Sequence, residues 1–468
     1  MRRAWGISST VVSQDDPSSE SEHLREPDGG AAQSPSRVRY WVLGLLCALA
    51  FVAYVLRNAF AVLGTDVRTD LGLTSEHLAD LMFAFLMAYA VFEVPWGVLC
   101  DRLGARHILV LVTLGWSIVT ALSGLAVLLP RTAVWGDASQ AFLYLLALRF
   151  LFGGFQAGVF PVISRVIGDW MPVSRRASAK GLVWTCSRAG GAAAGFLVIK
   201  QSWETSLAVL SLLGLVWCVA FWPWFRNRPA QVRSVNAAEL RAIDAGRGLG
   251  PPAGAGFPWR AILRSRSIWC LCFMYGFAGF TASFYITLLP DYLRSYRQLS
   301  PEATTWISSL PLACGVAGCA AGGFISDRIG RRTGSRNLGR RLTAMGGFIN
   351  GGIAILATIW VQDPWLLGAL LAASFFCFDL TMGPAWATCV DIGERRAGLV
   401  GGAMNMFGNL GAAAGSKVAG SGLAAAGNDA VFVAFACSYW LAALCWLGID
   451  ATKTLDCDRA QVPHAGAA

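Results

Sequence analysis

Charged residues are scarce in this sequence. Asp, Glu, Lys and Arg together make up 14% of the 468 residues, whereas soluble domains carry about a quarter. Apolar residues make up 55%, and the mean hydropathy is +0.52. This balance excludes an ordinary soluble protein and indicates an all-α chain that crosses a membrane many times.

Motifs for catalysis and for metal binding are also missing. The sequence has no Walker loop, no HExxH helix and no recognisable Ser/His/Asp set, and its histidines fall outside the apolar runs. The 13 cysteines lie mainly inside apolar runs, and Cys270 and Cys272 are too close together for a standard zinc pair. We therefore expect no enzyme activity, no ATP-driven cycle, no cofactor and no metal site.

Long apolar runs fill most of the chain. Each is about 20 residues long, which is the length of a helix that spans the hydrocarbon core of a bilayer. The twelve predicted spans are approximately 40–63, 78–99, 108–129, 141–165, 178–200, 205–225, 267–290, 302–325, 342–362, 365–388, 398–422 and 429–449. The sequence therefore predicts a disordered tail over 1–38, a six-helix half over 39–225, a polar linker over 226–265, a second six-helix half over 266–450 and a tail over 451–468.

The net charge of +10 is carried by the loops. Arginines gather in the loops after even-numbered spans and in the linker, and few occur in the opposite loops. Because positive loop residues mark the cytoplasmic side, we expect both termini in the cytoplasm and a multi-pass protein of the plasma (inner) membrane. The same distribution argues against a nucleic-acid partner and indicates that these charges meet membrane lipids.

One short loop occurs twice. Residues 97–106 read GVLCDRLGAR, and GFISDRIGRR recurs at 323–332, about half the chain later. The loop resembles the signature G-x-L-x-D-R-x-G-R of the major facilitator superfamily. That resemblance implies twelve helices in two pseudo-symmetric six-helix halves and transport by alternating access. We expect Asp101 and Asp327 to dock against helix starts of the opposite half, at spans 11 and 5. The gating-loop candidates are Asp101, Arg102, Arg106, Asp327 and Arg328.

Three arginines lie inside predicted spans. Arg57 and Arg149 fall at similar depth, since a helix rises about 1.5 Å per residue. Two guanidinium groups at one level repel each other unless an acid or an anion lies between them, and Arg is suited to carboxylate or phosphate recognition. We therefore expect both to bind an anionic substrate, with Arg188 as a third candidate. Internal ion pairs are the alternative.

Two acidic residues also lie inside spans. Glu93 is expected to pair with Arg188, because both lie toward the inner side of the membrane. Asp379 has no evident partner in the sequence. Since ionisable groups inside a membrane usually serve transport, Glu93 and Asp379 are the candidates for ion coupling.

Further motifs narrow the resemblance. Span 1 contains YVLR at 54–57, span 4 contains RFLFGGFQAGVFP at 149–161, and span 11 contains NMFGNLG at 405–411. These motifs resemble the anion:cation symporter family, which includes galactonate-type sugar-acid transporters, sialin and vesicular glutamate transporters. The resemblance implies a secondary active transporter of small organic anions, such as sugar acids or other carboxylates. It marks Arg57 and Arg149 as anion-binding residues and Asn405 as a polar contact. Weaker candidates are Tyr54, Gln156, Arg188, Tyr285, Trp386 and Asn409.

Two positions depart from the family pattern. Leu56 stands where Asp often precedes the span-1 Arg, and Gln156 replaces a Glu in span 4. In better-understood members these acids take part in proton coupling. The resemblance therefore leaves two mechanisms open: Asp379 or Glu93 carries the proton, with Asp379 favoured, or the carrier exchanges one anion for another. An organophosphate:phosphate exchanger and a non-transporting receptor are the alternative functions, and we expect a monomer.

Overall fold

The computed structural model describes residues 34–130, 133–135, 138–198, 202–245, 259–425 and 428–454. Within these ranges the chain is almost entirely helical, and the strands found there form one short antiparallel pair, β1 (Ala133–Trp135) with β2 (Ala138–Ser139). The predicted tails therefore lie outside the described residues, apart from 34–38 and 451–454.

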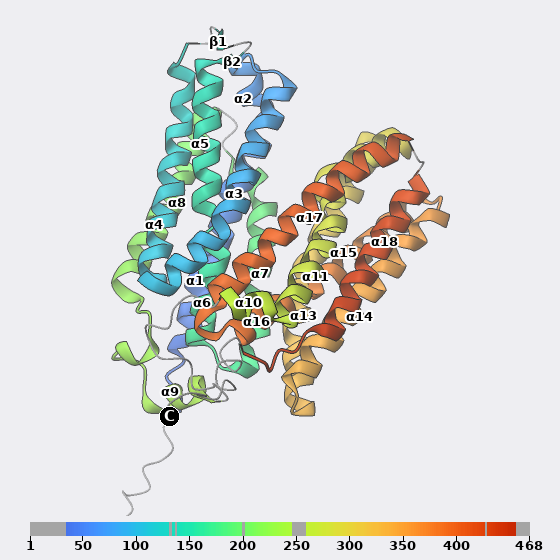
Figure 1. Cartoon of the computed structure of the whole chain (residues 1–468). Helices are drawn as coiled ribbons and strands as arrows, with labels where there is room; N and C mark the ends of the chain where they lie inside the picture. Colours follow the sequence, from blue (N-terminus) through green and yellow to red (C-terminus); the bar gives the residue numbers. More distant parts are fainter. Residues whose placement is uncertain are drawn as a thin grey trace, which may run out of the picture.

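The helices fall into two halves (Figure 1). The first half contains α1 (Val38–Val62), α2 (Gly64–Leu71), α3 (Ser75–Leu103), α4 (Ala105–Ser123), α5 (Gln140–Gln156), α6 (Val159–Trp170), α7 (Arg176–Leu197) and α8 (Trp203–Trp224). The second contains α11 (Arg266–Ser283), α12 (Leu289–Asp291), α13 (Pro301–Thr333), α14 (Arg336–Ala357), α15 (Pro364–Leu380), α16 (Met382–Gly393), α17 (Ala397–Ala425) and α18 (Asn428–Cys445).

Long helices occupy all twelve predicted spans. Nine spans in the described part of the chain are long and apolar enough to cross a membrane by length and composition alone. The other three are α7, α11 and α17, of which α7 packs against α13 and α17 packs against α3 across the interface between the halves. Helices at such an interface carry more small and polar residues, which lowers their hydropathy. The predicted twelve-helix membrane fold is confirmed.

Two predicted spans are each confirmed as one membrane span, but each consists of two consecutive helices. The span at 141–165 is α5 followed by α6, and the span at 365–388 is α15 followed by α16. Pro161 and Pro384 each occupy the third position of the second piece. A proline ring clashes with the carbonyl four residues earlier and donates no backbone hydrogen bond, which explains both breaks.

The linker contains two short helices, α9 (Ala237–Asp244) and α10 (Trp259–Arg264), and its residues 246–258 lie outside the described ranges. Glu239 of α9 is fully buried against the start of α1, where it accepts hydrogen bonds from the backbone N–H groups of Val38 and Arg39, both at 3.0 Å. A carboxylate in this position is stabilised by the free N–H groups of the helix start. The linker is therefore attached to the first half.

The two halves meet at one end and diverge at the other (Figure 1). We call these the closed end, which carries α9, and the open end, which carries β1 and β2. At the closed end the backbones of the halves touch: a Cβ added to Gly97 of α3 would lie 2.6 Å from the carbonyl oxygen of Gly398 of α17, and one added to Gly323 of α13 would meet the carbonyl oxygen of Ala177 of α7. Only glycine permits this approach.

Candidate functional site

Arg57 of α1 contacts an amide and three aromatic rings, and no acidic side chain bonds to it in the described part of the structure. Its Nε donates to Oε1 of Gln156 at 2.9 Å, and Gln156 in turn donates to the carbonyl of Ala53 at 2.7 Å. The guanidinium carbon lies 4.5 Å from the ring centre of Tyr89 and 4.9 Å from that of Tyr54. Cation–π contacts hold the charge in place without neutralising it.

Arg149 of α5 is the second predicted anion-binding arginine, and its Nε lacks the hydrogen bond that the Nε of Arg57 makes. The residue is 4% exposed, and its Nε has no hydrogen-bond partner among the described residues. Its guanidinium carbon lies 4.1 Å from the ring centre of Phe60 and 4.8 Å from that of Phe152. The ring of Phe85 lies 5.2 Å from both Arg57 and Arg149, so the two cations share one aromatic neighbour, as the prediction of similar depth requires.

Glu93 does not pair with Arg188, so that prediction is wrong. The Glu93 carboxylate is fully buried and accepts hydrogen bonds from the side-chain amides of Asn405 and Asn409 on α17, the latter at 3.4 and 3.5 Å. This contact joins α3 of one half to α17 of the other. Amides satisfy a carboxylate by hydrogen bonding but supply no positive charge.

Arg188 pairs with Asp379, a residue for which the sequence indicated no partner. The Nε of Arg188 donates to Oδ2 of Asp379 at 3.1 Å, and its Nη2 donates to Oδ1 at 2.8 Å. Two parallel hydrogen bonds of this kind form the strong, bidentate interaction between an arginine and a carboxylate. It joins α7 to α15 and spans the two halves at mid-depth.

Aromatic rings close the space between the halves below these charges. The rings of Phe160 and Trp184 stack at 4.5 Å, and Trp386 lies 5.7 Å from Trp184. Trp386 is fully buried and donates to the hydroxyl of Tyr275 at 3.0 Å. Tyr285, the other aromatic candidate, packs on Phe375 with ring centres 4.8 Å apart. Trp386 thus lies at the inter-half layer, whereas Tyr285 packs within the second half.

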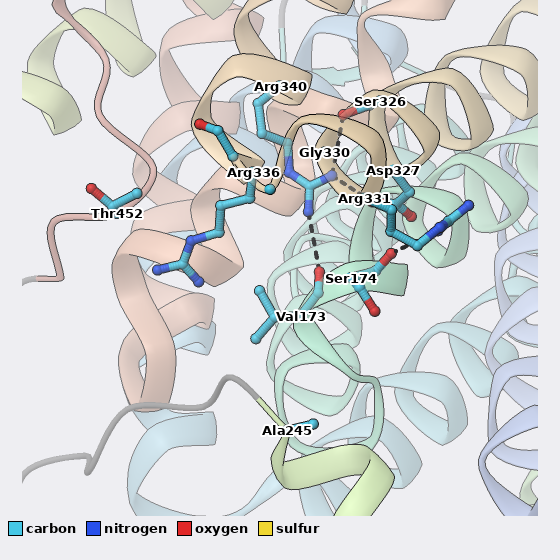
Figure 2. Close-up of a pocket in the computed structure, with 12 residues that line it drawn as sticks. Val173, Ser174, Ala245, Ser326, Asp327, Gly330, Arg331, Arg336, Arg340 and Thr452 are labelled. Carbon is cyan, nitrogen blue, oxygen red and sulfur yellow. Dashed lines mark hydrogen bonds and ion pairs between the residues drawn. The ribbon is translucent and has the colours of Figure 1, made fainter.

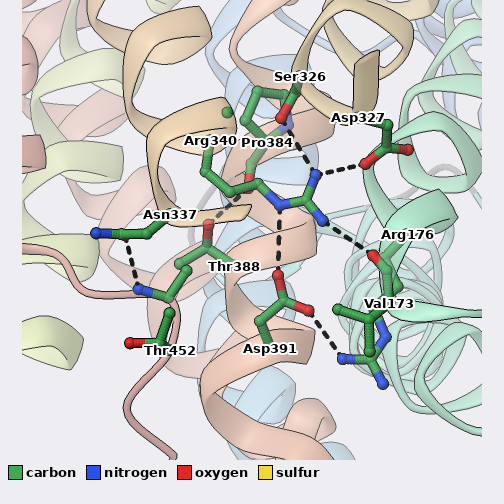
Figure 3. Close-up of polar contacts among 12 residues, drawn as sticks. Val173, Arg176, Ser326, Asp327, Asn337, Arg340, Pro384, Thr388, Asp391 and Thr452 are labelled. Atoms are coloured by element: carbon green, nitrogen blue, oxygen red, sulfur yellow. Dashed lines mark hydrogen bonds and ion pairs between the residues drawn. The ribbon is translucent and has the colours of Figure 1, made fainter. Parts of the chain in front are cut away.

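A network of ion pairs holds the closed end together. Arg340 donates to Asp327 at 2.6 Å, to Ser326 at 3.2 Å and to the carbonyl of Val173 at 3.4 Å (Figure 2). Asp391 accepts from Arg340 at 3.3 Å and from Arg176 of the first half at 2.8 Å (Figure 3). Arg340 and Arg176 are 1% and 3% exposed. Sequence reasoning counted both as loop charges and missed them.

The two gating loops differ. Asp327 accepts from the backbone N–H of Ser178 at 2.7 Å and from its hydroxyl at 2.6 Å, so it docks at the start of α7 as predicted. Asp101 pairs instead with Arg165 of its own half at 3.4 Å, and Arg165 also bonds Asp169 at 2.8 Å. Asp101 also interacts electrostatically with Arg396, the residue that precedes α17 of the other half, so it lies near the start of α17 as expected, although its ion pair is to Arg165.

The arginines of these loops lie at the surface. Arg102 is exposed, and Arg106 donates to the carbonyl of Trp222 at 2.6 Å while lying over its ring at 4.2 Å. Arg328 lies 6.0 Å from the ring centre of Phe324 on its own helix. These contacts anchor the loops rather than bridge the halves.

Lys180 of α7 is a buried cation that sequence reasoning did not single out. It is fully buried, its Nζ contacts the hydroxyl of Ser164 at 2.5 Å, and it lies 4.8 Å from the ring centre of Trp386. Its position near the start of a predicted span favoured a surface interpretation. The available signal was the position of Lys180, which lies four residues after the first residue of α7 and faces another helix.

These features define a membrane carrier of two helical halves with cations buried between them. The model of the Major Facilitator Superfamily matches residues 45–416. The chain belongs to this superfamily, and it is a transporter rather than an enzyme.

Curated relatives extend the comparison. The probable sulfoacetate transporter SauU of Cupriavidus necator is 31% identical over 374 residues, which cover 79% of this chain and 84% of that protein. The probable galactarate/D-glucarate transporter GudP of Bacillus subtilis is 27% identical over 396 residues, with 81% and 84% covered. The predicted similarity to sugar-acid transporters is confirmed.

Solved structures show the same fold. The proton:xylose symporter XylE superposes with a TM-score of 0.69 at 13% identity, covering 90% of this chain and 99% of that one. The fucose:proton symporter FucP of E. coli gives 0.66 at 12% identity, covering 87% and 98%. At these identities the likeness concerns the fold alone.

Proposed function

We propose that this transporter carries a small organic anion, of the carboxylate or sulfonate class, which binds between the halves against Arg149 and Arg57. The observation that carries the proposal is the state of Arg149. This guanidinium is buried among aromatic rings, has an Nε without a partner in the described structure and has no ion pair there. A bound oxyanion supplies both the missing hydrogen bonds and the missing charge.

The relatives support this substrate class. The names of the relatives from Cupriavidus necator and Bacillus subtilis specify a sulfonated carboxylate and two sugar diacids. Such molecules carry oxyanions that a guanidinium fork can bind through two parallel hydrogen bonds. An organophosphate:phosphate exchanger is the less favoured function, because α11 has no arginine after Arg266 at its start.

We place the closed end in the cytoplasm, which makes the conformation outward-open. The loops at this end carry Arg102, Arg175, Arg331 and Arg332, all exposed, and positive loops face the cytoplasm. Both termini then lie in the cytoplasm, and the protein is a monomer of the plasma membrane. The open site faces the outside, from which the anion enters.

Glu93 is the better candidate for proton coupling, although sequence reasoning favoured Asp379. Both oxygens of Asp379 are bonded by Arg188, so a proton on this carboxylate would have to displace a hydrogen bond of the ion pair. Glu93 faces Asn405, Asn409, Tyr89 and the more distant Arg57, and no cation among the described residues forms a salt bridge with it. Because Glu93 also joins the two halves, a change in its charge alters the contact between them.

Binding to the purified protein tests the anion site. Sugar diacids, sulfoacetate and neutral sugars are compared for the rise in unfolding temperature, since a ligand of the folded state stabilises it by mass action. Arg149→Lys keeps the charge and removes the fork, so anion binding should weaken at least about tenfold. Arg233→Lys, at an exposed linker position, is the matched control. Unchanged affinity in Arg149→Lys contradicts the proposal.

Uptake into proteoliposomes tests the coupling residue. With an imposed pH gradient and no internal substrate, the wild type should accumulate the anion, and Glu93→Gln should abolish the response to the gradient while retaining anion exchange. Asp379→Asn should lower the amount of folded protein. The folded fraction of this variant should still accumulate the anion in response to the pH gradient. Gradient-driven uptake in Glu93→Gln excludes Glu93, and uptake that requires internal anion in the wild type supports exchange.

A further inference from the structure

Lys180 of α7 is a buried cation that the proposed substrate site does not use. Its Nζ donates to the hydroxyl oxygen of Ser164 at 2.5 Å, because that hydroxyl itself donates to the carbonyl of Phe160 at 2.9 Å. Among the described residues no carboxylate forms an ion pair with Lys180, and the titratable group that acts on it electrostatically is the thiol of Cys389. The described part of the chain therefore supplies no counter-charge for this ammonium.

The ammonium of Lys180 also has hydrogen-bonding capacity left over. It carries three N–H donors, and the acceptor that it bonds among the described residues is the hydroxyl of Ser164. An ammonium buried in a membrane protein is costly unless an anion compensates it, so such residues usually serve the passage of a ligand. An apolar side chain of similar shape would fill the same space at a lower cost.

Lys180 lies at the interface between the halves, on the closed-end side of the aromatic layer described above. Its Nζ lies 4.8 Å from the ring centre of Trp386, which belongs to α16 of the second half. One helical turn earlier, Arg176 bonds Asp391 at the closed end. A side chain of the opposite half thus covers Lys180, and separation of the halves at the closed end uncovers it.

Three side chains with hydrogen-bond donors follow one face of α7. Lys180, Trp184 and Arg188 are spaced four residues apart, which corresponds to about 6 Å along the helix for each step. The indole Nε1 of Trp184 is buried and has no hydrogen-bond partner among the described residues. This face therefore leads from the ion pair of Arg188 at mid-depth, past the aromatic layer, to the uncompensated ammonium of Lys180.

We propose that Lys180 binds the transported anion on the closed-end side, after the anion has left Arg149 and Arg57 and before it leaves the protein. The inference rests on the proposed function and adds a further binding residue to it. When the halves part at the closed end, Trp386 withdraws with the second half, and an oxyanion takes its place beside the ammonium. While the closed end is shut, Lys180 is covered and does not compete with Arg149 for the anion.

A purely structural contact between the halves is the competing role, because the cation–π contact of Lys180 with Trp386 joins them. The two roles predict opposite effects on affinity at the closed-end side. Loss of a structural contact favours opening at that end, which strengthens binding from that side. Loss of an anion-binding residue weakens binding from the same side.

Transport measured from each side separates the two roles. Initial rates of uptake of radiolabelled sulfoacetate and galactarate are measured in membrane vesicles of both orientations. Labelling of Thr69→Cys, in a protein that lacks Cys437, identifies the vesicles that present the open end to the medium. In Lys180→Met the half-saturating concentration should rise at least about tenfold on the closed-end side only. Arg332→Gln removes an exposed charge at the closed end and should behave like the wild type on both sides.

Two further measurements guard against misfolding. Methionine keeps an unbranched side chain and removes the buried charge, so Lys180→Met should unfold at a temperature at least as high as that of the wild type. Lys180→Cys should lose affinity on the closed-end side and regain it after reaction with 2-aminoethyl methanethiosulfonate, which adds an ammonium, but not after reaction with the neutral ethyl reagent. The wild type treated with each reagent controls for the native cysteines.

The outcomes that overturn the proposal are distinct. They are an unchanged half-saturating concentration of Lys180→Met on the closed-end side, a lower one on that side, or equal rises on both sides. Failure of the proposed function gives a different result, because the wild type then transports neither anion from either side, and both proposals fall.

Discussion

Arg188 and Asp379 form an ion pair that joins the two halves of the transporter at mid-depth. Both oxygens of the carboxylate are used, at 2.8 and 3.1 Å, and the aspartate is fully buried. Arg57 and Arg149, on the other side of the same space, have no such partner in the described structure. One of these three buried cations is therefore neutralised by the protein, and the other two have no ion pair in the described structure.

The Arg188–Asp379 pair predicts strongly non-additive effects on stability. Asp379→Asn or Arg188→Gln alone leaves one buried charge without its partner, which typically costs about 3–5 kcal/mol. The double variant Arg188→Gln/Asp379→Asn leaves neither charge, so it should unfold at a higher temperature than either single variant. Thermal unfolding of the four purified proteins measures this. If the double variant is no more stable than the singles, the two residues do not act as a pair.

The two gating aspartates should differ in their effect on conformation. Asp327 bonds Ser178 of the opposite half, whereas Asp101 bonds Arg165 of its own half. Asp327→Asn should therefore separate the halves at the closed end in a larger fraction of molecules than Asp101→Asn does. Distances between spin labels on the two halves measure these fractions. Equal shifts in the two variants would show that the loops act alike.

The glycine contact at the closed end should be sensitive to a single methyl group. A Cβ at Gly97 would lie 2.6 Å from the carbonyl oxygen of Gly398, so Gly97→Ala should disfavour closure by about 1–3 kcal/mol. Gly44→Ala is the matched control, because nothing lies within 4 Å of the added Cβ. The same label distances should show more closed-end opening in Gly97→Ala only. Identical distributions in both variants contradict the contact.

Labelling of intact cells tests the orientation. In a background that lacks the exposed Cys437, a membrane-impermeant thiol reagent should label Thr69→Cys at the open end and should not label Arg332→Cys at the closed end. After permeabilisation both should react. Labelling of Arg332→Cys from outside would reverse the proposed topology.

The sequence was sufficient for the fold but only partly for the site. Runs of about 20 apolar residues and the doubled loop at 97–106 and 323–332 predict the spans and the two halves. The breaks in α5/α6 and α15/α16 escaped a criterion based on run length, although Pro161 and Pro384 gave a local signal for them.

Depth along a helix can be predicted from the sequence, but rotation and neighbours cannot. Arg57 and Arg149 were predicted to lie at similar depth, and in the structure both lie 5.2 Å from the ring centre of Phe85. The same reasoning wrongly paired Glu93 with Arg188, because α3 packs on α17 and α7 packs on α13 across the interface. Which side chains meet depends on which helices of the two halves are neighbours.

The paired proline breaks separate the parts of the transporter mechanically. Arg149 and Asp379 lie on α5 and α15, before the breaks, whereas Trp386 and Asp391 lie on α16, after one of them. A broken helix transmits bending poorly from one piece to the other, so α6 and α16 can tilt while the charged groups keep their spacing. Under the proposed function, the anion then meets Arg57 and Arg149 in the same arrangement from either side of the membrane. The proposed coupling group, and not a rebuilt binding site, is then what distinguishes the two sides.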